Sequence, residues 1–267
     1  SVWTLFVPEK PAISHRKAGM HPLLSTDAEL QEWCSSYIAK QPELPDRIYF
    51  YSTGASVPVV NLRIGQIFGE AFHLNPTHIE VATDLLASAR ATCQHEPGIS
   101  CILGTGSNAG LYDGKNIVQR AGGLGYVLGD EGSGAHLGKN LLMDYLRGDL
   151  PEAVRKTLEA ETACSPEEVI RSIYKKPFAN QYLASFAPFI IGRQEQEYFR
   201  QLIKSSLSAF LEYTVKRFPG HGQLPVHFTG SVAWYLRPLI EEVCRENLLP
   251  AGEFQKDSVE GLIRYHG

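Results

Sequence analysis

A glycine-rich segment that directly follows an apolar, strand-like stretch contains the groups that bind phosphate. Residues 102–108 (ILGTGSN) include two glycines and two hydroxyl side chains, Thr105 and Ser107. Glycines permit positive φ and close backbone approach, and consecutive exposed N–H groups together with hydroxyls can surround a phosphate oxygen. The segment therefore predicts either a phosphate cradle or a plain tight turn.

Two familiar nucleotide-binding loops do not fit this chain. A dinucleotide-binding loop needs G-x-G-x-x-G at the start of a helix, but Ala109 stands where the third glycine would be, and residues 113–114 (DG) signal a hairpin. A Walker loop at residues 138–139 fails because Gly132 lies one position too far upstream and Asn140 replaces the required Ser or Thr. The pattern indicates strand, turn and strand.

A second stretch, residues 122–138 (GGLGYVLGDEGSGAHLG), is far denser in glycine than the whole chain, which has 24 glycines in 267 residues. Because so much glycine costs conformational entropy on folding, a binding surface explains this stretch better than a purely structural role in tight turns does. Asp130 and Glu131 precede a helix expected to start near Ser133. Either carboxylate could cap that helix, and Asp130 could instead accept hydrogen bonds from ligand hydroxyls.

Two further positions lie where a strand gives way to a helix, which is where ligands bind in α/β sheets. Asp84 follows an expected strand at residues 79–82. Residues 229–231 (TGS) join an expected strand at 225–229 to a helix at 232–245. The second junction is either a plain connection or a helix N-terminus that faces a nucleotide.

The elements that must position these residues alternate between strand and helix, which is typical of an α/β protein. Residues 25–40 and 61–73 have helical periodicity, and residues 47–52 form a short apolar strand. From residue 133 to about residue 218 the pattern is helical. Each half of the chain has a small meander followed by strand–helix units, which hints at a duplicated fold.

The composition excludes several classes of protein. Hydrophobic residues make up 43% and charged residues 20% of the chain, an ordinary balance for a folded globular protein. With 25 Lys and Arg against 29 Asp and Glu, the formal charge is −4, so a nucleic-acid partner is not expected. No apolar run approaches the roughly 20 residues that cross a bilayer. Five scattered cysteines without a C-x-x-C pair predict free thiols and a cytoplasmic protein.

Taken together and in order, Asp84 after a strand, ILGTGSN, GYVLGDEGSGAHLGK and HFTGSVAWYL resemble the N-acetylglucosamine kinase and BadF/BadG-type ATPase family. That family belongs to the actin, hexokinase and Hsp70 superfamily, and its bacterial sugar-kinase-like branch looks closest. The resemblance implies two RNase H-like lobes with a cleft between them. We expect the first lobe at residues 1–97, with residues 258–267 packing back on it. The second lobe would span residues 98–257 and carry a helical insertion at about 133–218.

The resemblance also implies roles for individual residues. Asp84 matches the catalytic base that takes the proton from a sugar hydroxyl, although it could instead cap the helix that follows. The residues implied to bind the ATP phosphates and adenosine are Gly104, Thr105, Gly106, Gly230 and Ser231. Those implied to bind the sugar are Asn108, Gly125, Asp130 and, in a turn where relatives often place Asn, His21. ATP and Mg²⁺ are the implied cofactors, with no metal ligand assigned.

One departure from the family pattern concerns its first phosphate loop, a D-x-G-x-T-K hairpin. Residues 1–4 (SVWT) resemble the strand that follows this loop, and no later D-x-G-x-T replaces it. We expect that the loop is missing because the chain is truncated. The alternative is a naturally inactive homologue.

The leading hypothesis is ATP-dependent phosphorylation of an amino sugar such as N-acetylglucosamine. The alternatives are an ATPase that energises a partner enzyme, as in the dehydratase-activator branch with its iron–sulfur cluster between subunits, and a sugar or nucleotide sensor without turnover. The apolar helices expected at residues 182–189 and 199–218 are explained either by packing within a lobe or by a homodimer.

Overall fold

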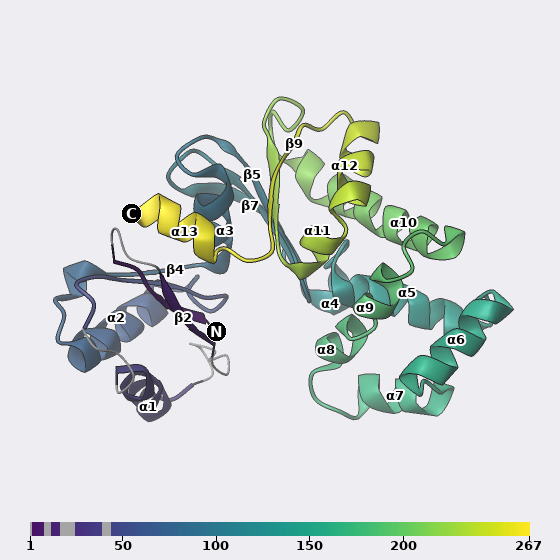
Figure 1. The fold of residues 1–267 in the computed structure, drawn as a ribbon, viewed down its shortest axis with the longest axis horizontal. Helices are drawn as coiled ribbons and strands as arrows, with labels where there is room; N and C mark the ends of the chain where they lie inside the picture. Colours follow the sequence, from purple (N-terminus) through teal and green to yellow (C-terminus); the bar gives the residue numbers. More distant parts are fainter. Residues whose placement is uncertain (1, 8–11, 17–24, 39–43) are drawn as a thin grey trace.

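A five-stranded sheet forms the centre of the computed structural model, which describes residues 2–7, 12–16, 25–38 and 44–267 (Figure 1). Its strands lie in the order β7-β6-β5-β8-β9. Strand β6 is antiparallel to both its neighbours, whereas β8 is parallel to β5 and to β9. This is the RNase H-like arrangement, and the α/β class predicted from the sequence is confirmed. The bounds are β5 (Gly98–Leu103), β6 (Ser107–Tyr112), β7 (Ile117–Gly122), β8 (Val226–Thr229) and β9 (Ala251–Gln255).

The two faces of this sheet differ because side chains alternate along a strand. On β5, Ile99, Cys101 and Leu103 are fully buried in the largest hydrophobic core, whereas Ser100 points to the opposite face. That core joins the sheet to α5, α10, α11 and α12. Helix α3 covers the other face, as Figure 1 shows. The helices named here are α3 (Asp84–Cys93), α5 (Gly134–Arg147), α10 (Glu197–Tyr213), α11 (Ser231–Tyr235) and α12 (Arg237–Glu246).

Helices fill the stretch between β7 and β8, as the sequence predicts. Several pack beside α5 at some distance from the sheet (Figure 1). The remaining elements of this stretch are α4 (Gly125–Leu128), α6 (Glu152–Thr162), α7 (Pro166–Tyr174), α8 (Ala179–Ala184), α9 (Ala187–Ile191) and η2 (Val215–Arg217). No helix among the described residues is both long and apolar enough to cross a membrane.

The first part of the chain has its own hydrophobic core, in which the Trp3 ring stacks on Tyr37 with centroids 4.4 Å apart. Strands β1 and β2 pair antiparallel, and β3 and β4 pair parallel. The elements are β1 (Val2–Leu5), β2 (Ile13–Arg16), α1 (Asp27–Ile38), β3 (Ile48–Tyr51), α2 (Pro58–Phe72), η1 (Pro76–His78) and β4 (Ile79–Ala82). The division into lobes at residue 97 stays a prediction.

The last helix, α13 (Val259–His266), packs against α3 and reaches β3 (Figure 1). The two helices approach closely at Gly261, where an added Cβ would lie only 2.4 Å from the Ala91 carbonyl oxygen. His266, the last residue of α13, belongs to a chain of hydrogen bonds with α3 and β3. The Arg90 guanidinium donates to the Tyr51 hydroxyl at 2.8 Å, and that hydroxyl lies 2.8 Å from His266 Nε2. Since Arg90 is a donor only, the Tyr51 hydroxyl can donate onward to an unprotonated His266.

This hydrogen-bond chain predicts that stability depends on the protonation of His266. Burial and the Arg90 charge lower the pKa of His266 to about 4. The neighbouring groups include Glu80, which is paired with Arg90, and Tyr49, whose ring centroid lies 3.6 Å from that of the imidazole; the rings of Tyr51 and Tyr265 also lie beside it. Because the unfolded pKa is about 6.5, the stabilisation is present above that pH and is lost as pH falls toward 4.

We expect the free energy of unfolding to fall by about 1–2 kcal/mol more between pH 7 and pH 5 in the natural chain than in His266→Gln. Denaturant titrations of both proteins at several pH values measure this difference, and the contributions of other titrating groups cancel in it. Parallel pH profiles for the two proteins would show that His266 does not titrate as proposed.

Candidate active site

The segment predicted as a phosphate cradle is a hairpin turn between β5 and β6. Leu103 pairs with Ser107 across the hairpin, and the Gly104 N–H donates to the Gly106 carbonyl at 3.0 Å. Thr105 is exposed at the tip, and a Cβ placed on Gly104 would meet nothing within 4 Å. The turn is therefore open for an anionic group to approach its backbone.

The first turn of α5 supports this hairpin from behind. The Gly134 N–H donates to the Gly104 carbonyl at 2.8 Å, and the Ala135 N–H donates to the Thr105 carbonyl at 3.1 Å. These helix N–H groups hold the turn in place. Because these two N–H groups are already bonded, a phosphate would be bound by the turn rather than by the N-terminus of α5.

Asp130 lies against the same turn. Its side chain is buried, and a Cβ on Gly106 would lie 2.8 Å from Asp130 Oδ2. Burial raises the pKa of this carboxyl, while the N–H groups of Ser107 and Gly125 oppose the rise. Asp130 itself has a φ of 59°, a conformation that Asp tolerates better than most residues. The strained backbone and the facing N–H groups fix the carboxylate next to the turn.

Asn108 and Gly125 complete this side of the site. The Asn108 amide packs against Gly123, where a Cβ would lie 3.2 Å from its Oδ1. Gly125 has a φ of 79° and opens α4, and a Cβ there would meet nothing within 4 Å. The absence of a side chain at Gly123 thus leaves room beside the Asn108 amide, and the backbone at Gly125 is open.

Gly230 and Ser231 lie on the opposite side of the β5–β6 turn. Gly230 has a φ of 109°, and a Cβ on it would lie 2.3 Å from the Leu103 carbonyl oxygen. Only glycine allows β8 to pass into α11 so close to the end of β5. The structure therefore brings the two predicted nucleotide segments together.

Asp84 begins α3, but it is not the N-cap of that helix. The cap is Thr83, whose hydroxyl accepts the Leu86 N–H at 3.2 Å. Asp84 Oδ1 accepts the Leu85 N–H at 2.8 Å. Burial raises the pKa of Asp84, and the Arg120 charge and the Leu85 N–H oppose the rise. A half-buried carboxylate with a raised pKa is suited to accept a proton.

The other capping alternative is also wrong. Neither Asp130 nor Glu131 caps α5, because the Ser133 hydroxyl accepts the His136 N–H at 3.1 Å. In the sequence, Asp130 and Glu131 resemble capping residues because they lie shortly before the expected helix. The helix begins only at Gly134, so the capping position is Ser133. His21 lies outside the described residues.

A buried trio of hydroxyls links the helix of Asp84 to both predicted nucleotide segments. Ser88 Oγ lies 2.7 Å from Ser100 Oγ and 2.8 Å from Thr229 Oγ1. All three side chains are buried. Since Ser100 is on β5 and Thr229 precedes Gly230, the trio fixes α3 against the strands that end at the two turns. The sequence carries no local signal for this contact.

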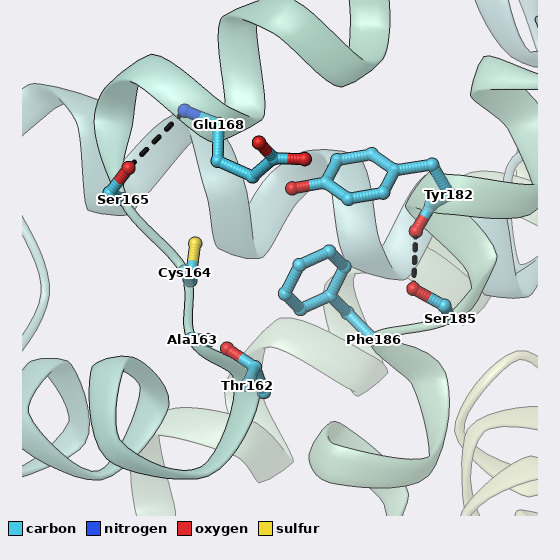
Figure 2. A pocket seen from close by; sticks show the side chains of 8 residues that line it. All are labelled: Thr162, Ala163, Cys164, Ser165, Glu168, Tyr182, Ser185 and Phe186. Carbon is cyan, nitrogen blue, oxygen red and sulfur yellow. Dashed lines mark hydrogen bonds between the residues drawn. The ribbon is translucent and has the colours of Figure 1, made fainter. Parts of the chain in front are cut away.

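The described residues also line a hollow of about 540 Å³ in the helical region between β7 and β8 (Figure 2). The Tyr182 hydroxyl and the Glu168 carboxylate point toward each other across it. None of the predicted site residues that the structure describes lines it; the lining consists of Thr162, Ala163, Cys164, Ser165, Glu168, Tyr182, Ser185 and Phe186.

Comparisons with known proteins bear on the family and the fold of the chain. No protein-family model and no curated protein matches the sequence. The solved structure of a "putative N-acetylglucosamine kinase" from Porphyromonas gingivalis matches with a TM-score of 0.87 and 35% identity, covering 95% of this chain and 90% of that one. A second structure of the same description, from Chromobacterium violaceum, has a TM-score of 0.56 and 23% identity, covering 76% of this chain and 71% of that one. The second match shows the fold alone.

Proposed function

The chain belongs to the N-acetylglucosamine kinase family, within the actin-like ATPases, and we propose that it is a sugar kinase that transfers the γ-phosphoryl group of ATP to a hydroxyl of an amino sugar. The observation that carries this proposal is Asp84. Its carboxylate is half-buried and has a raised pKa, and the helix cap is supplied by Thr83 instead. Asp84 is therefore free to act on a substrate proton.

ATP would bind at the two turns that lie beside the end of β5, the β5–β6 turn and the junction of β8 with α11. The open backbone at Gly104 and the exposed Thr105 suit the phosphates, and the Gly230–Ser231 junction suits the adenosine. Asn108, Gly125 and Asp130 would bind sugar hydroxyls. In phosphoryl transfer the protein chiefly positions the reactants and neutralises charge, so rigid turns held by backbone hydrogen bonds are appropriate.

Mg²⁺ would supply charge neutralisation on the phosphates when it is bound. It is usually held by one or two carboxylates together with phosphate oxygens and water. The described residues contain no cluster of three or more His, Cys, Asp or Glu that could hold a metal.

The partner-activating ATPase gains no support from the cysteines of this chain. All five thiols are buried, and burial raises the pKa of Cys93 and Cys244 to about 12. Thiols in this state cannot reach a cluster shared between subunits without rearrangement. That activity, the sensor without turnover and the homodimer stay predictions.

The test is ADP release by the intact protein with ATP and Mg²⁺, measured by a coupled assay. N-acetylglucosamine, N-acetylmuramic acid, glucosamine and glucose are compared with a sugar-free control. We expect release that depends on an N-acetylated amino sugar. ATP hydrolysis that no sugar stimulates would favour the partner-activating ATPase, and an absence of turnover with measurable nucleotide binding would favour the sensor.

A further inference from the structure

Arg120 on β7 is a cation that the proposed site does not yet include. It lies directly opposite Gly110 of β6 in the antiparallel ladder. Directly opposed residues of such a pair point to the same face of the sheet. A Cβ on Gly110 would lie 3.0 Å from Leu85, the residue after Asp84. The Arg120 side chain therefore leaves the sheet on the face that carries the first turn of α3.

Asn108 lies on the same face, two residues before Gly110. The residues that alternate with these two, Ala109 and Leu111, pack into the core on the opposite face. The side of β6 and β7 that faces α3 thus presents one amide and one guanidinium, and Asp84 stands at the N-terminus of the helix above them. These are three polar groups of different chemistry on one surface.

The Arg120 guanidinium is available for a ligand within the part of the chain that the structure describes. It is exposed there and has neither a hydrogen bond nor an ion pair with another described residue. Its charge nevertheless acts on Asp84, where it opposes the effect of burial on the pKa. Other charged groups on or near α3 lie around its C-terminal half: Glu80 with Arg90, Glu253 near Cys93, and His266 near Arg90.

We propose that Arg120 is a further residue of the reaction site, where its guanidinium binds the transferred phosphoryl group beside Asp84; this rests on the proposed kinase function. As the sugar oxygen attacks, its O–H bond breaks and the proton passes to the Asp84 carboxylate. A bond forms between the sugar oxygen and the γ-phosphorus, and the bond from that phosphorus to the β–γ bridging oxygen breaks, releasing ADP. A guanidinium is always charged and can contact two phosphoryl oxygens at once.

The same cation also keeps Asp84 in its basic form. Burial favours the protonated carboxyl, which could not accept the sugar proton. A positive charge nearby favours the carboxylate, so it extends activity toward lower pH. Removing Arg120 should therefore have two separate effects, a slower reaction and an altered pH profile.

The experiment compares Arg120→Met, Arg120→Lys and the control Lys115→Met, which removes an exposed cation from the turn of the same β6–β7 hairpin. We expect Arg120→Met to lower kcat about 10–100-fold, as loss of a hydrogen bond to a charged group does. We also expect the acidic limb of its kcat/KM profile to move to higher pH. Arg120→Lys should recover much of the lost kcat and much of the natural pH profile. Lys115→Met should resemble the natural chain in both measurements.

A second measurement does not depend on turnover. Carbon-13 NMR titration of the Asp84 carboxyl, assigned by its absence in Asp84→Asn, should give a higher pKa in Arg120→Met than in the natural chain. An unchanged Asp84 titration together with kcat within about twofold of the natural chain would overturn the inference. A raised pKa in a protein that phosphorylates no sugar would support the pairing of Arg120 with Asp84 and overturn the proposed function.

Discussion

The Asp84→Asn variant is expected to lose about 10²–10⁴-fold in kcat, the usual contribution of a positioned acid or base. Asn has the same shape, and its Oδ1 can still accept the Leu85 N–H that Asp84 accepts at 2.8 Å. The helix cap is untouched because Thr83 supplies it. What is lost is an oxygen that can take a proton. The Michaelis constants for ATP and sugar should therefore stay close to those of the natural chain.

Steady-state kinetics across pH, with thermal unfolding of each protein, tests this prediction. Asp46→Asn, an exposed carboxylate in the loop before β3, is the matched control and should behave as the natural chain does. If Asp84→Asn keeps kcat within about threefold of the natural chain, the base assignment is wrong. A large loss of thermal stability would instead indicate a structural role for the carboxylate.

The local features of the site could be predicted because they depend on neighbours in the sequence. The absence of a third glycine at Ala109 predicted strand, turn and strand at residues 102–108, and β5 and β6 confirm it. The strand at residues 79–82 is β4, with the same bounds. In both cases the local pattern of side chains was enough to predict the element.

The caps were harder to predict because several residues before each helix could serve. Asp84 was a possible cap of α3, and Asp130 or Glu131 a possible cap of α5, yet the hydroxyls of Thr83 and Ser133 take these roles. A cap depends on which residue adopts the extended backbone just before the helix. Both Thr83 and Ser133 do so, with ψ of 154° and 166°.

The contacts between distant segments could not be predicted. Arg120 lies in β7, but the face of the sheet on which its side chain lies depends on the register of β7 with β6. That ladder shifts at Leu111 and Tyr112, so simple alternation along β7 does not give the face of every residue. The contact of Ser88 with Ser100 and Thr229 likewise depends on how α3 lies across the sheet. Register and helix placement are tertiary properties.

The Gly138→Ala variant is expected to lose about 3 kcal/mol or more of its free energy of unfolding, at or beyond the upper end of overpacking effects. Gly138 is buried in the middle of α5, where α8 crosses it. An added Cβ would lie 1.9 Å from the Leu183 carbonyl oxygen and 2.8 Å from the Leu183 carbonyl carbon. Backbone atoms cannot rotate away as a flexible side chain can, so α5 and α8 must separate.

Gly65→Ala is the matched control, since Gly65 is also inside a helix, α2, but a Cβ there would meet nothing within 4 Å. It should be stabilised by about 0.5–1 kcal/mol through helix propensity alone. Denaturant unfolding of both variants measures the contrast, and equal effects would contradict the packing argument. The loss at Gly138 should also reach the site. Because the N–H groups of Gly134 and Ala135 hold the β5–β6 turn, a displaced α5 would weaken ATP binding even under conditions where the variant remains folded.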